Sequence, residues 1–195
     1  MSYRFAASGF SLPLSNARLA FATIAKAGFA GVEGFHSMHE LAGCASPAEL
    51  RAIAEGHGVP FTSHHLPFGP DRDIASFYET DRQRAVDGQS RSMEVAAALG
   101  AGVAIQHPAS ALLDIRTEDA RRYHDQLVRS LEVLAPRAAD LGIRIAVENM
   151  MQSGHQCYFG LPEHIAELAR AVDHPNVGFC LDTGHALISM EIGRA

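Results

Sequence analysis

Apolar and polar positions follow one repeating pattern along this chain of 195 residues. A short run of strand-forming residues is followed by a turn, an amphipathic helix, a glycine and the next run, which is typical of βα units and a parallel sheet. Six strands are predicted, at residues 3–7, 30–34, 60–65, 102–106, 143–148 and 177–182. No linker interrupts the pattern, so we expect a single α/β domain over residues 1–195.

Helix start and stop signals agree with this division. Ser46, Pro47 and Glu49 supply an N-cap, a proline at the first helical position and an acid in the first turn. Pro136 falls inside a long helix that is predicted to end at Leu141, and it is expected to kink or break that helix. The helices are predicted over residues 16–26, 46 to 56 or 58, 77–99, 117–141 and 162–172.

Two architectures fit this order of elements, an open doubly wound sheet and a (β/α) barrel. No G-x-G-x-x-G follows the first strand and no G-x-x-x-x-G-K-[ST] occurs in the chain, which removes the usual evidence for a nucleotide-binding open sheet. A TIM barrel is therefore favoured. Because a complete barrel has eight units, we expect a TIM-barrel type domain truncated to about six, lacking the last two βα units.

Composition narrows the class of protein. A hydrophobic share of 47% with 19% charged residues, and no apolar run near the length of a membrane span, predicts a soluble protein without a membrane partner. The first residues lack the pattern of a secretory signal, so a cytoplasmic location is expected. Three cysteines without a C-x-x-C pair argue against a disulfide framework. The net charge of -6 disfavours nucleic acid as a partner, whereas eleven histidines direct attention to metal ligands.

The stretch from Val177 to His185 brings an aspartate and a histidine to one place. In a strand of period two, Phe179 and Leu181 share one face and Asp182 lies on the other, so the bulky face is expected to pack against helices in a buried strand. A buried carboxylate needs a hydrogen-bond, charged or metal partner, and Asp182 therefore requires one.

Chemically active side chains stand at the ends of five successive predicted strands, where α/β active sites form. A lone residue of this kind is more often solvated or simply hydrogen-bonded, but five together favour a site. Adjacent parallel strands lie about 4.8 Å apart, so carboxylates at corresponding heights can share one cation. Glu148 is the expected partner of Asp182, and Glu33 and Asn149 are expected substrate contacts. The strand-end residues are Glu33, His64, His65, His107, Glu148, Asn149 and Asp182, with His185 just beyond.

Strand parity separates the paired histidines, since His64 and His65 point to opposite sides of a regular strand. We expect His65 to reach the centre and His64 to pack or face solvent. His107, followed by Pro108, is expected to be a ligand or substrate contact. His36 and His39 form an H-x-x-H after the second strand, which is a weak signal outside a helix.

These motifs resemble the xylose isomerase-like TIM-barrel superfamily, which holds sugar isomerases and epimerases together with abasic-site nucleases of the endonuclease IV type. The resemblance covers nearly the whole chain, and its most specific segments are residues 65–68, 106–108, 145–149 and 179–185. It implies that Glu148 and Asp182 bind a catalytic divalent metal ion (Mn²⁺, Mg²⁺, Co²⁺ or Zn²⁺) and that His185 contacts substrate or a further metal. It also implies that His65 and His107 join a zinc cluster in the nuclease branch or line the sugar pocket in the isomerase branch.

Two departures from the family pattern stand out. Ketose 3-epimerases of the family carry a second glutamate six residues after the metal-binding one, where this chain has Gly154. The family's further metal ligands on the seventh and eighth strands have no counterpart before Ala195.

Three functions follow as hypotheses. The first is a metal-dependent isomerase or epimerase of a small sugar or sugar phosphate, acting by proton transfer through an enediolate, with Glu148 and His185 as catalytic groups and His65 and His107 as substrate contacts. The second is an abasic-site endonuclease. The third is an incomplete barrel with little activity of its own, whose unpaired edge strands would favour a homo-oligomer or a partner chain.

Overall fold

Six parallel strands form one sheet in the order in which they occur along the chain. The structure is a computed structural model that describes residues 4–109, 119–151 and 159–192. An order without reversal is that of a barrel, because a doubly wound sheet changes direction at a switch point. The TIM-barrel type α/β fold is therefore confirmed. The strands are β1 (Ala6–Ser8), β2 (Gly31–Phe35), β3 (Phe61–His65), β4 (Val103–Gln106), β5 (Arg144–Glu148) and β6 (Val177–Cys180).

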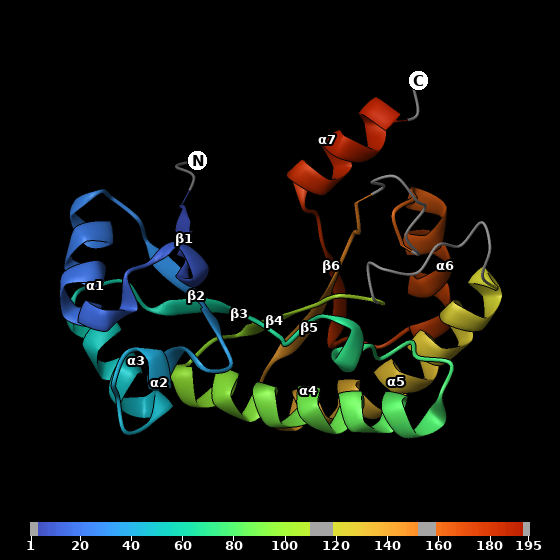
Figure 1. Ribbon diagram of the computed structural model, residues 1–195, viewed down its shortest axis with the longest axis horizontal. Coiled ribbons are helices and arrows are strands. Elements are labelled where there is room, and N and C mark those ends of the chain that lie inside the picture. The colour runs from blue at the N-terminus through green and yellow to red at the C-terminus, as the bar shows by residue number, and fades with distance from the viewer. Residues whose placement is uncertain (1–3, 110–118, 152–158, 193–195) are drawn as a thin grey trace.

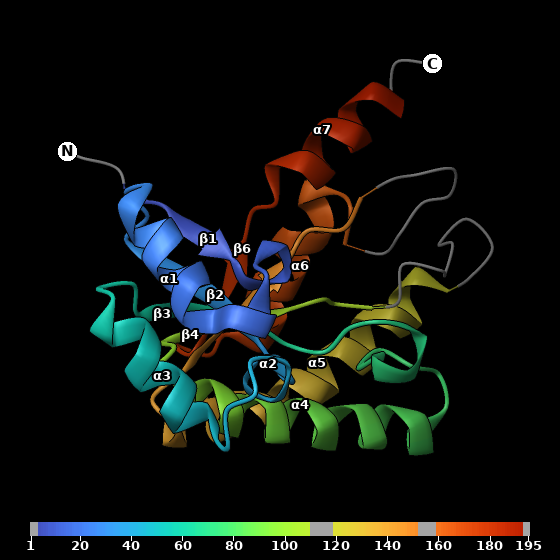
Figure 2. The same ribbon diagram turned by 60° about the vertical axis from the view of Figure 1, so that its left-hand side comes forward.

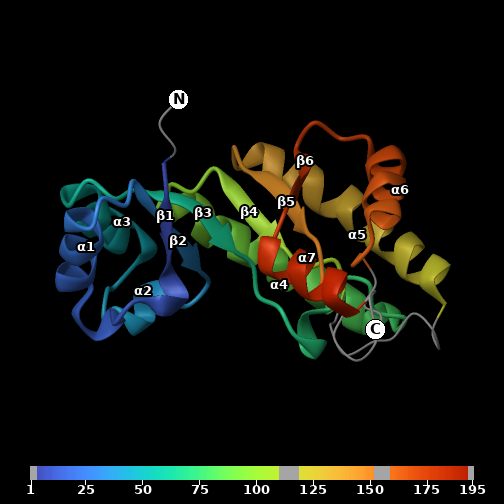
Figure 3. The ribbon, with the colours of Figure 1, turned by 90° about the horizontal axis from the view of Figure 1, so that it is seen from above.

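Helices follow the outside of the strands on their left, lower and right sides in Figure 1, and Figure 3 shows the strands succeeding one another from β1 to β6. The last helix, α7, projects from the end of β6 away from the others in both Figure 1 and Figure 2. The helices are α1 (Ala17–Lys26), α2 (Met38–Leu41), α3 (Pro47–Gly56), α4 (Glu79–Leu99), α5 (Ala120–Asp140), α6 (Pro162–Val172) and α7 (Thr183–Ile192). Short 3₁₀ turns are η1 (Gly9–Ser11), η2 (Leu14–Asn16) and η3 (Pro70–Arg72).

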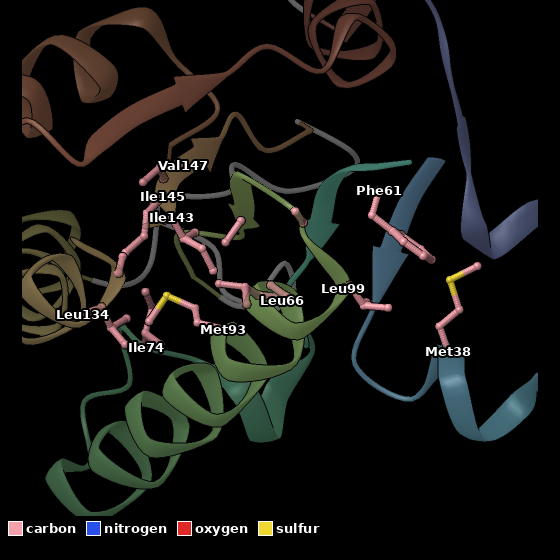
Figure 4. Close-up of a cluster of buried hydrophobic side chains, with 14 of the residues drawn as sticks. Met38, Phe61, Leu66, Ile74, Met93, Leu99, Leu134, Ile143, Ile145 and Val147 are labelled. Atoms are coloured by element: carbon pink, nitrogen blue, oxygen red, sulfur yellow. The ribbon is translucent and has the colours of Figure 1, made fainter. Parts of the chain in front are cut away.

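The hydrophobic core lies between the sheet and the helices that follow its outer face. Figure 4 shows Phe61 from β3, Met93 and Leu99 from α4, and Ile145 and Val147 from β5 among its members. Ile145 and Val147 are fully buried, as the predicted helix-packing face of that strand requires. The opposite face of each strand points away from these helices, toward the inside of the curved sheet.

Capping residues set the helix boundaries close to the predicted ones. The Ser46 hydroxyl accepts from the Glu49 amide at 3.2 Å, and the Glu49 carboxylate accepts from the Ala45 amide at 2.8 Å. Asp119 accepts from the first amides of α5. Helix α5 continues through Pro136, so the proline does not break it. Residues 117 and 118, the start predicted for this helix, lie outside the described residues.

Two predictions about the strands were wrong in detail. Strand β6 is not buried on its bulky face, because Phe179 is 41% exposed and Leu181, the residue that follows the strand, is 70% exposed. Among the described strands β6 pairs only with β5, and no described helix covers Leu181. Strand β2 runs on to Phe35, so Glu33 lies within the strand, next to a register shift after Val32.

Within the described parts of the chain, no helix combines the length and the apolar character needed to cross a bilayer.

Gly9 allows η1 to approach strand β2 closely. A Cβ at this position would lie 2.4 Å from the main-chain oxygen of Glu33, so Gly9→Ala is expected to destabilise the fold by about 1–3 kcal/mol. Gly56→Ala is the control, because nothing lies within 4 Å of a Cβ there and alanine favours the helix. Urea denaturation should show a lower midpoint for the first variant only; equal midpoints would contradict the close approach.

Candidate metal centre and substrate pocket

A hollow of about 650 Å³ opens at the carboxyl ends of the strands. It brings together six of the side chains that the sequence analysis identified. They come from strands β2, β3 and β5, from the residues that follow β4 and β6, and from helix α7. They are Glu33, His65, His107, Glu148, Asp182 and His185. Residues more than 150 positions apart therefore share one pocket, since Glu33 and His185 both line it.

Glu148 is the central acid of this pocket. Its Oε2 lies 3.0 Å from Nε2 of His107 and 3.6 Å from Nε2 of His65. This oxygen is buried, yet it accepts no hydrogen bond of good geometry from any described residue. One ligand atom each of His65, His107 and Glu148 lie within 4.8 Å of one another, which is the arrangement of ligands around a shared cation.

The second ring nitrogen of His65 supports this arrangement. Nδ1 lies 2.8 Å from the main-chain oxygen of Leu66, to which it donates when it carries the proton. The tautomer then leaves a lone pair on Nε2, on the side of Glu148. Metal-binding histidines commonly donate their other N–H to a backbone carbonyl in this way. His64, on the opposite side of the strand, is fully buried with Nε2 3.0 Å from the Ser92 hydroxyl, so the parity prediction is confirmed.

Asp182 finds a partner that the sequence did not reveal. Its Oδ1 accepts from the His185 amide at 2.7 Å, so it caps the N-terminus of α7. Its other oxygen, Oδ2, lies 3.8 Å from Nδ1 of His185. One ligand atom each of Glu148, Asp182 and His185 lie within 4.8 Å of one another, and the same holds for His65, His107 and Glu148. Two possible ion positions therefore share Glu148.

Asn149 was expected to contact substrate, but the structure uses its side chain to hold Asp182. Its Oδ1 accepts from the Asp182 amide at 2.6 Å and its Nδ2 donates to the Asp182 carbonyl at 3.1 Å. Its own carbonyl lies 2.8 Å from Nδ1 of His185. When Nδ1 of His185 donates there, Nε2 is the nitrogen left for other chemistry. Asn149 thus fixes the positions of both residues that follow β6.

Carboxylates give the pocket a negative potential. Burial raises the pKa of the Cys180 thiol, and the charges of Glu148, Glu33 and Asp182 raise it further, to about 11. The thiol therefore stays neutral near pH 7, and the same charges favour a cation in the pocket. Burial also raises the pKa of Glu148, but the adjacent His107 and His65 outweigh burial and hold this pKa below its usual value.

Glu33 stands between two serines in register on neighbouring strands. The Ser8 hydroxyl donates to its Oε1 at 3.5 Å and the Ser63 hydroxyl donates to its Oε2 at 3.4 Å. These long bonds leave the carboxylate able to accept hydrogen bonds from a ligand in the pocket.

Two phenylalanines of the pocket were missed from the sequence. Phe10 of η1 and Phe68 of the loop after β3 both line it, and the Phe68 ring stacks on His107 with centroids 4.8 Å apart. Phe10 packs edge-on to His65 at 5.8 Å. Their place just after strands β1 and β3 was the available signal, because loops at that end of the sheet surround the site.

The donor set fits a divalent cation. Carboxylate oxygens suit Mg²⁺ and Mn²⁺, whereas imidazole nitrogens suit Zn²⁺ and related transition metals, so a mixed set with two histidines favours Mn²⁺, Co²⁺ or Zn²⁺ over Mg²⁺. Glu148 and Asp182 would supply oxygens, and His65 and His107 nitrogens.

Comparison with known proteins gives the same fold and a family. Residues 21–193 match the family model described as xylose isomerase-like TIM barrel, and the chain therefore belongs to this family. It is 28% identical over 164 residues to a 3-dehydroshikimate dehydratase of Pseudomonas putida. The aligned region covers 84% of this chain and 24% of that protein.

Solved structures are similar over almost the whole chain. A D-psicose 3-epimerase has a TM-score of 0.80 at 19% identity, covering 95% of this chain and 65% of its own. A 3-keto-D-glucoside 4-epimerase from E. coli has a TM-score of 0.81 at 20% identity, covering 96% of this chain and 71% of its own. At this identity the likeness shows the fold. The chain spans between about a quarter and about half of the curated relatives that it matches.

Metal binding is expected to weaken as the pH falls. Burial lowers the pKa of His65, but the Glu148 carboxylate, the Leu66 carbonyl and the charge of Glu33 outweigh burial and leave the pKa raised. Protonated His65 pairs with Glu148 and offers no lone pair, so affinity is lowest below the His65 pKa and rises as the pH increases through it.

Calorimetric titration with Zn²⁺ between about pH 6 and about pH 8, in two buffers of different ionisation enthalpy, measures this directly. We expect tighter binding at the higher pH and proton release at the lower one. His65→Asn should flatten the dependence. An affinity that is constant over the range in the wild type would contradict the assignment of His65.

Proposed function

We propose that this member of the xylose isomerase-like TIM-barrel family is a divalent-metal-dependent isomerase or epimerase of a small sugar or sugar phosphate. The observation that carries the proposal is the buried Oε2 of Glu148, which lies 3.6 Å from Nε2 of His65 and 3.0 Å from Nε2 of His107, in a pocket that Asp182 also lines. The epimerases of similar fold and the related dehydratase support the choice of an enzyme acting on small molecules.

A divalent cation bound by Glu148 and Asp182 would polarise neighbouring hydroxyl and carbonyl oxygens of a substrate and stabilise an enediolate. The protein's part is proton transfer. Glu148 has two oxygens with different surroundings, since Oε2 faces the two histidines and Oε1 lies 3.9 Å from Nδ1 of His185. Oε1 is the candidate base for the carbon-bound proton, and Nε2 of His185, which carries a lone pair when Nδ1 donates to the Asn149 carbonyl, is the candidate acceptor of the proton of a substrate hydroxyl.

The other pocket residues bind and orient. Glu33 accepts hydrogen bonds from substrate hydroxyls, with its carboxylate held by Ser8 and Ser63. Phe10 and Phe68 line the pocket with apolar rings against which the carbon atoms of a substrate can pack. Asn149 acts through Asp182 and His185 and is a positioning residue.

We do not include ketose 3-epimerisation in the proposed activity. The glutamate that such enzymes of the family carry six residues after the metal ligand is Gly154 in this chain, and this position lies outside the described residues. An isomerase needs a base on one face of the enediolate only, and Glu148 is sufficient for that.

Deuterium exchange tests the proposal without knowledge of the product. The protein with Mn²⁺, incubated in D₂O with a panel of ketoses, aldoses and their phosphates, should introduce deuterium at a carbon next to the carbonyl of at least one substrate, as seen by NMR. Glu148→Gln should reduce the exchange rate by about 10²–10⁴-fold, because the base is removed.

Glu132→Gln is the matched control, because Glu132 is an exposed acid on α5 away from the pocket. Its exchange rate should equal that of the wild type. Exchange by wild type and Glu148→Gln at the same rate would refute the assignment of the base, and no exchange with any sugar would refute the isomerase proposal.

A second candidate function is an abasic-site endonuclease. Two ligand groups that share Glu148 could hold two cations, which suits the attack of an activated water on a phosphodiester. The net charge of -6 weighs against a DNA substrate. Cleavage of duplex DNA at an abasic site, together with no deuterium exchange into sugars, would favour this function instead.

A further inference from the structure

A second hollow lies beside the candidate active site. It has a volume of about 270 Å³, and it shares Phe10, His65 and Phe68 with the larger pocket. His36, Ser37 and Arg72 line the second hollow but not the larger pocket. A molecule that occupies both hollows therefore meets the basic side chain of Arg72 as well as the candidate metal ligands.

The main chain around Arg72 is fixed by helix α4. Gln89 is fully buried, and its Nε2 donates to the carbonyl of Pro67 at 2.8 Å and to that of Arg72 at 3.4 Å. One amide thus ties both ends of the loop that carries Phe68. The loop is held before any ligand binds, which reduces the entropy lost on binding.

The side chain of Arg72 also has a defined place. A Cβ on Gly88 of α4 would lie 3.6 Å from its Nη1, so the guanidinium lies against the helix at the position that has no side chain. Among the described residues, no carboxylate lies within ion-pair distance of Arg72, whereas Arg82, Arg84, Arg121 and Arg137 each have one. The charge of Arg72 is therefore available to a ligand.

Positive charge gathers around His36. Burial lowers the pKa of His36, Glu40 opposes this, and Arg72, His39 and Arg91 lower the pKa further. His36 is therefore neutral near pH 7, and the charges of Arg72 and Arg91 against that of Glu40 favour an anion at this place.

We propose that Arg72 and His36 bind an oxyanion group, a phosphate or a carboxylate, at the end of the substrate distant from the carbons that react at Glu148. This inference rests on the proposed function and specifies its substrate class as anionic rather than neutral sugars. A guanidinium is suited to the group because it donates two parallel hydrogen bonds to two oxygens. His36, which lines the same hollow, supplies a ring N–H.

Binding measurements with three ligands test this inference apart from catalysis. The Mn²⁺-loaded protein is titrated calorimetrically with D-fructose, D-fructose 6-phosphate and D-glucuronate. We expect one of the two anionic ligands to bind at least about 10-fold more tightly than D-fructose, and which one it is distinguishes phosphate from carboxylate.

Arg72→Gln should remove this preference while leaving the affinity for D-fructose unchanged. Arg84→Gln is the matched control, because Arg84 is an exposed arginine of α4 paired with Asp81 and lines neither hollow. Asp182→Asn should keep the preference, which separates an anion held by Arg72 from one held by the metal. Thermal melting confirms that each variant is folded.

Equal affinity of the wild type for all three ligands would overturn the inference, and so would a preference that survives in Arg72→Gln or disappears in Arg84→Gln. The outcome is independent of the deuterium experiment. If Arg72→Gln loses the preference for the anionic ligand but no deuterium exchanges into any sugar, the anion site is supported and the isomerase proposal is refuted.

Discussion

The arrangement of this site depends on the cost of burying one charged carboxylate. Glu148 is 7% exposed at the end of β5, and burial alone would favour its neutral form. Two histidines from the neighbouring chain segments offset that cost in the structure, and a cation bound by the same atoms would offset it more completely. Strands β3, β4, β5 and β6 lie side by side in sequence order, and this order brings the histidine side chains close to Glu148.

Local chemistry made most of the fold predictable. The six strands and helices α1, α3, α4, α5 and α6 were predicted from the alternation of apolar and polar residues, from capping residues and from glycines. Each of these signals depends only on residues close in the sequence, as at Ser46 and Pro162. The exposure of Phe179 and Leu181 did not follow, because the covering of a strand depends on its neighbours in space and not on its own pattern. Helix α7 was also missed, although Asp182 is placed as its N-cap.

The sequence predicted which charged and histidine side chains line the pocket, but it did not predict which contacts each of them makes. Strand parity put His64 and His65 on opposite faces, and the structure places His65 in the pocket and His64 in the core. Asn149 shows the limit of such reasoning. Its sequence position suggests a substrate contact, yet the amide is used to hold Asp182, and only the spatial approach of β5 and β6 reveals this. Phe10 and Phe68 belong to loops, whose paths a periodic pattern does not define.

The most direct test of the account is the position of a bound metal ion. Crystals of the protein with Zn²⁺, measured at wavelengths on both sides of the zinc absorption edge, locate the ion by its anomalous signal. The account predicts an ion at about 2.0–2.2 Å from an oxygen of Glu148, with further ligands drawn from His65, His107 and Asp182. Zinc bound elsewhere with Glu148 free of it, or no zinc at millimolar concentration, would contradict the account.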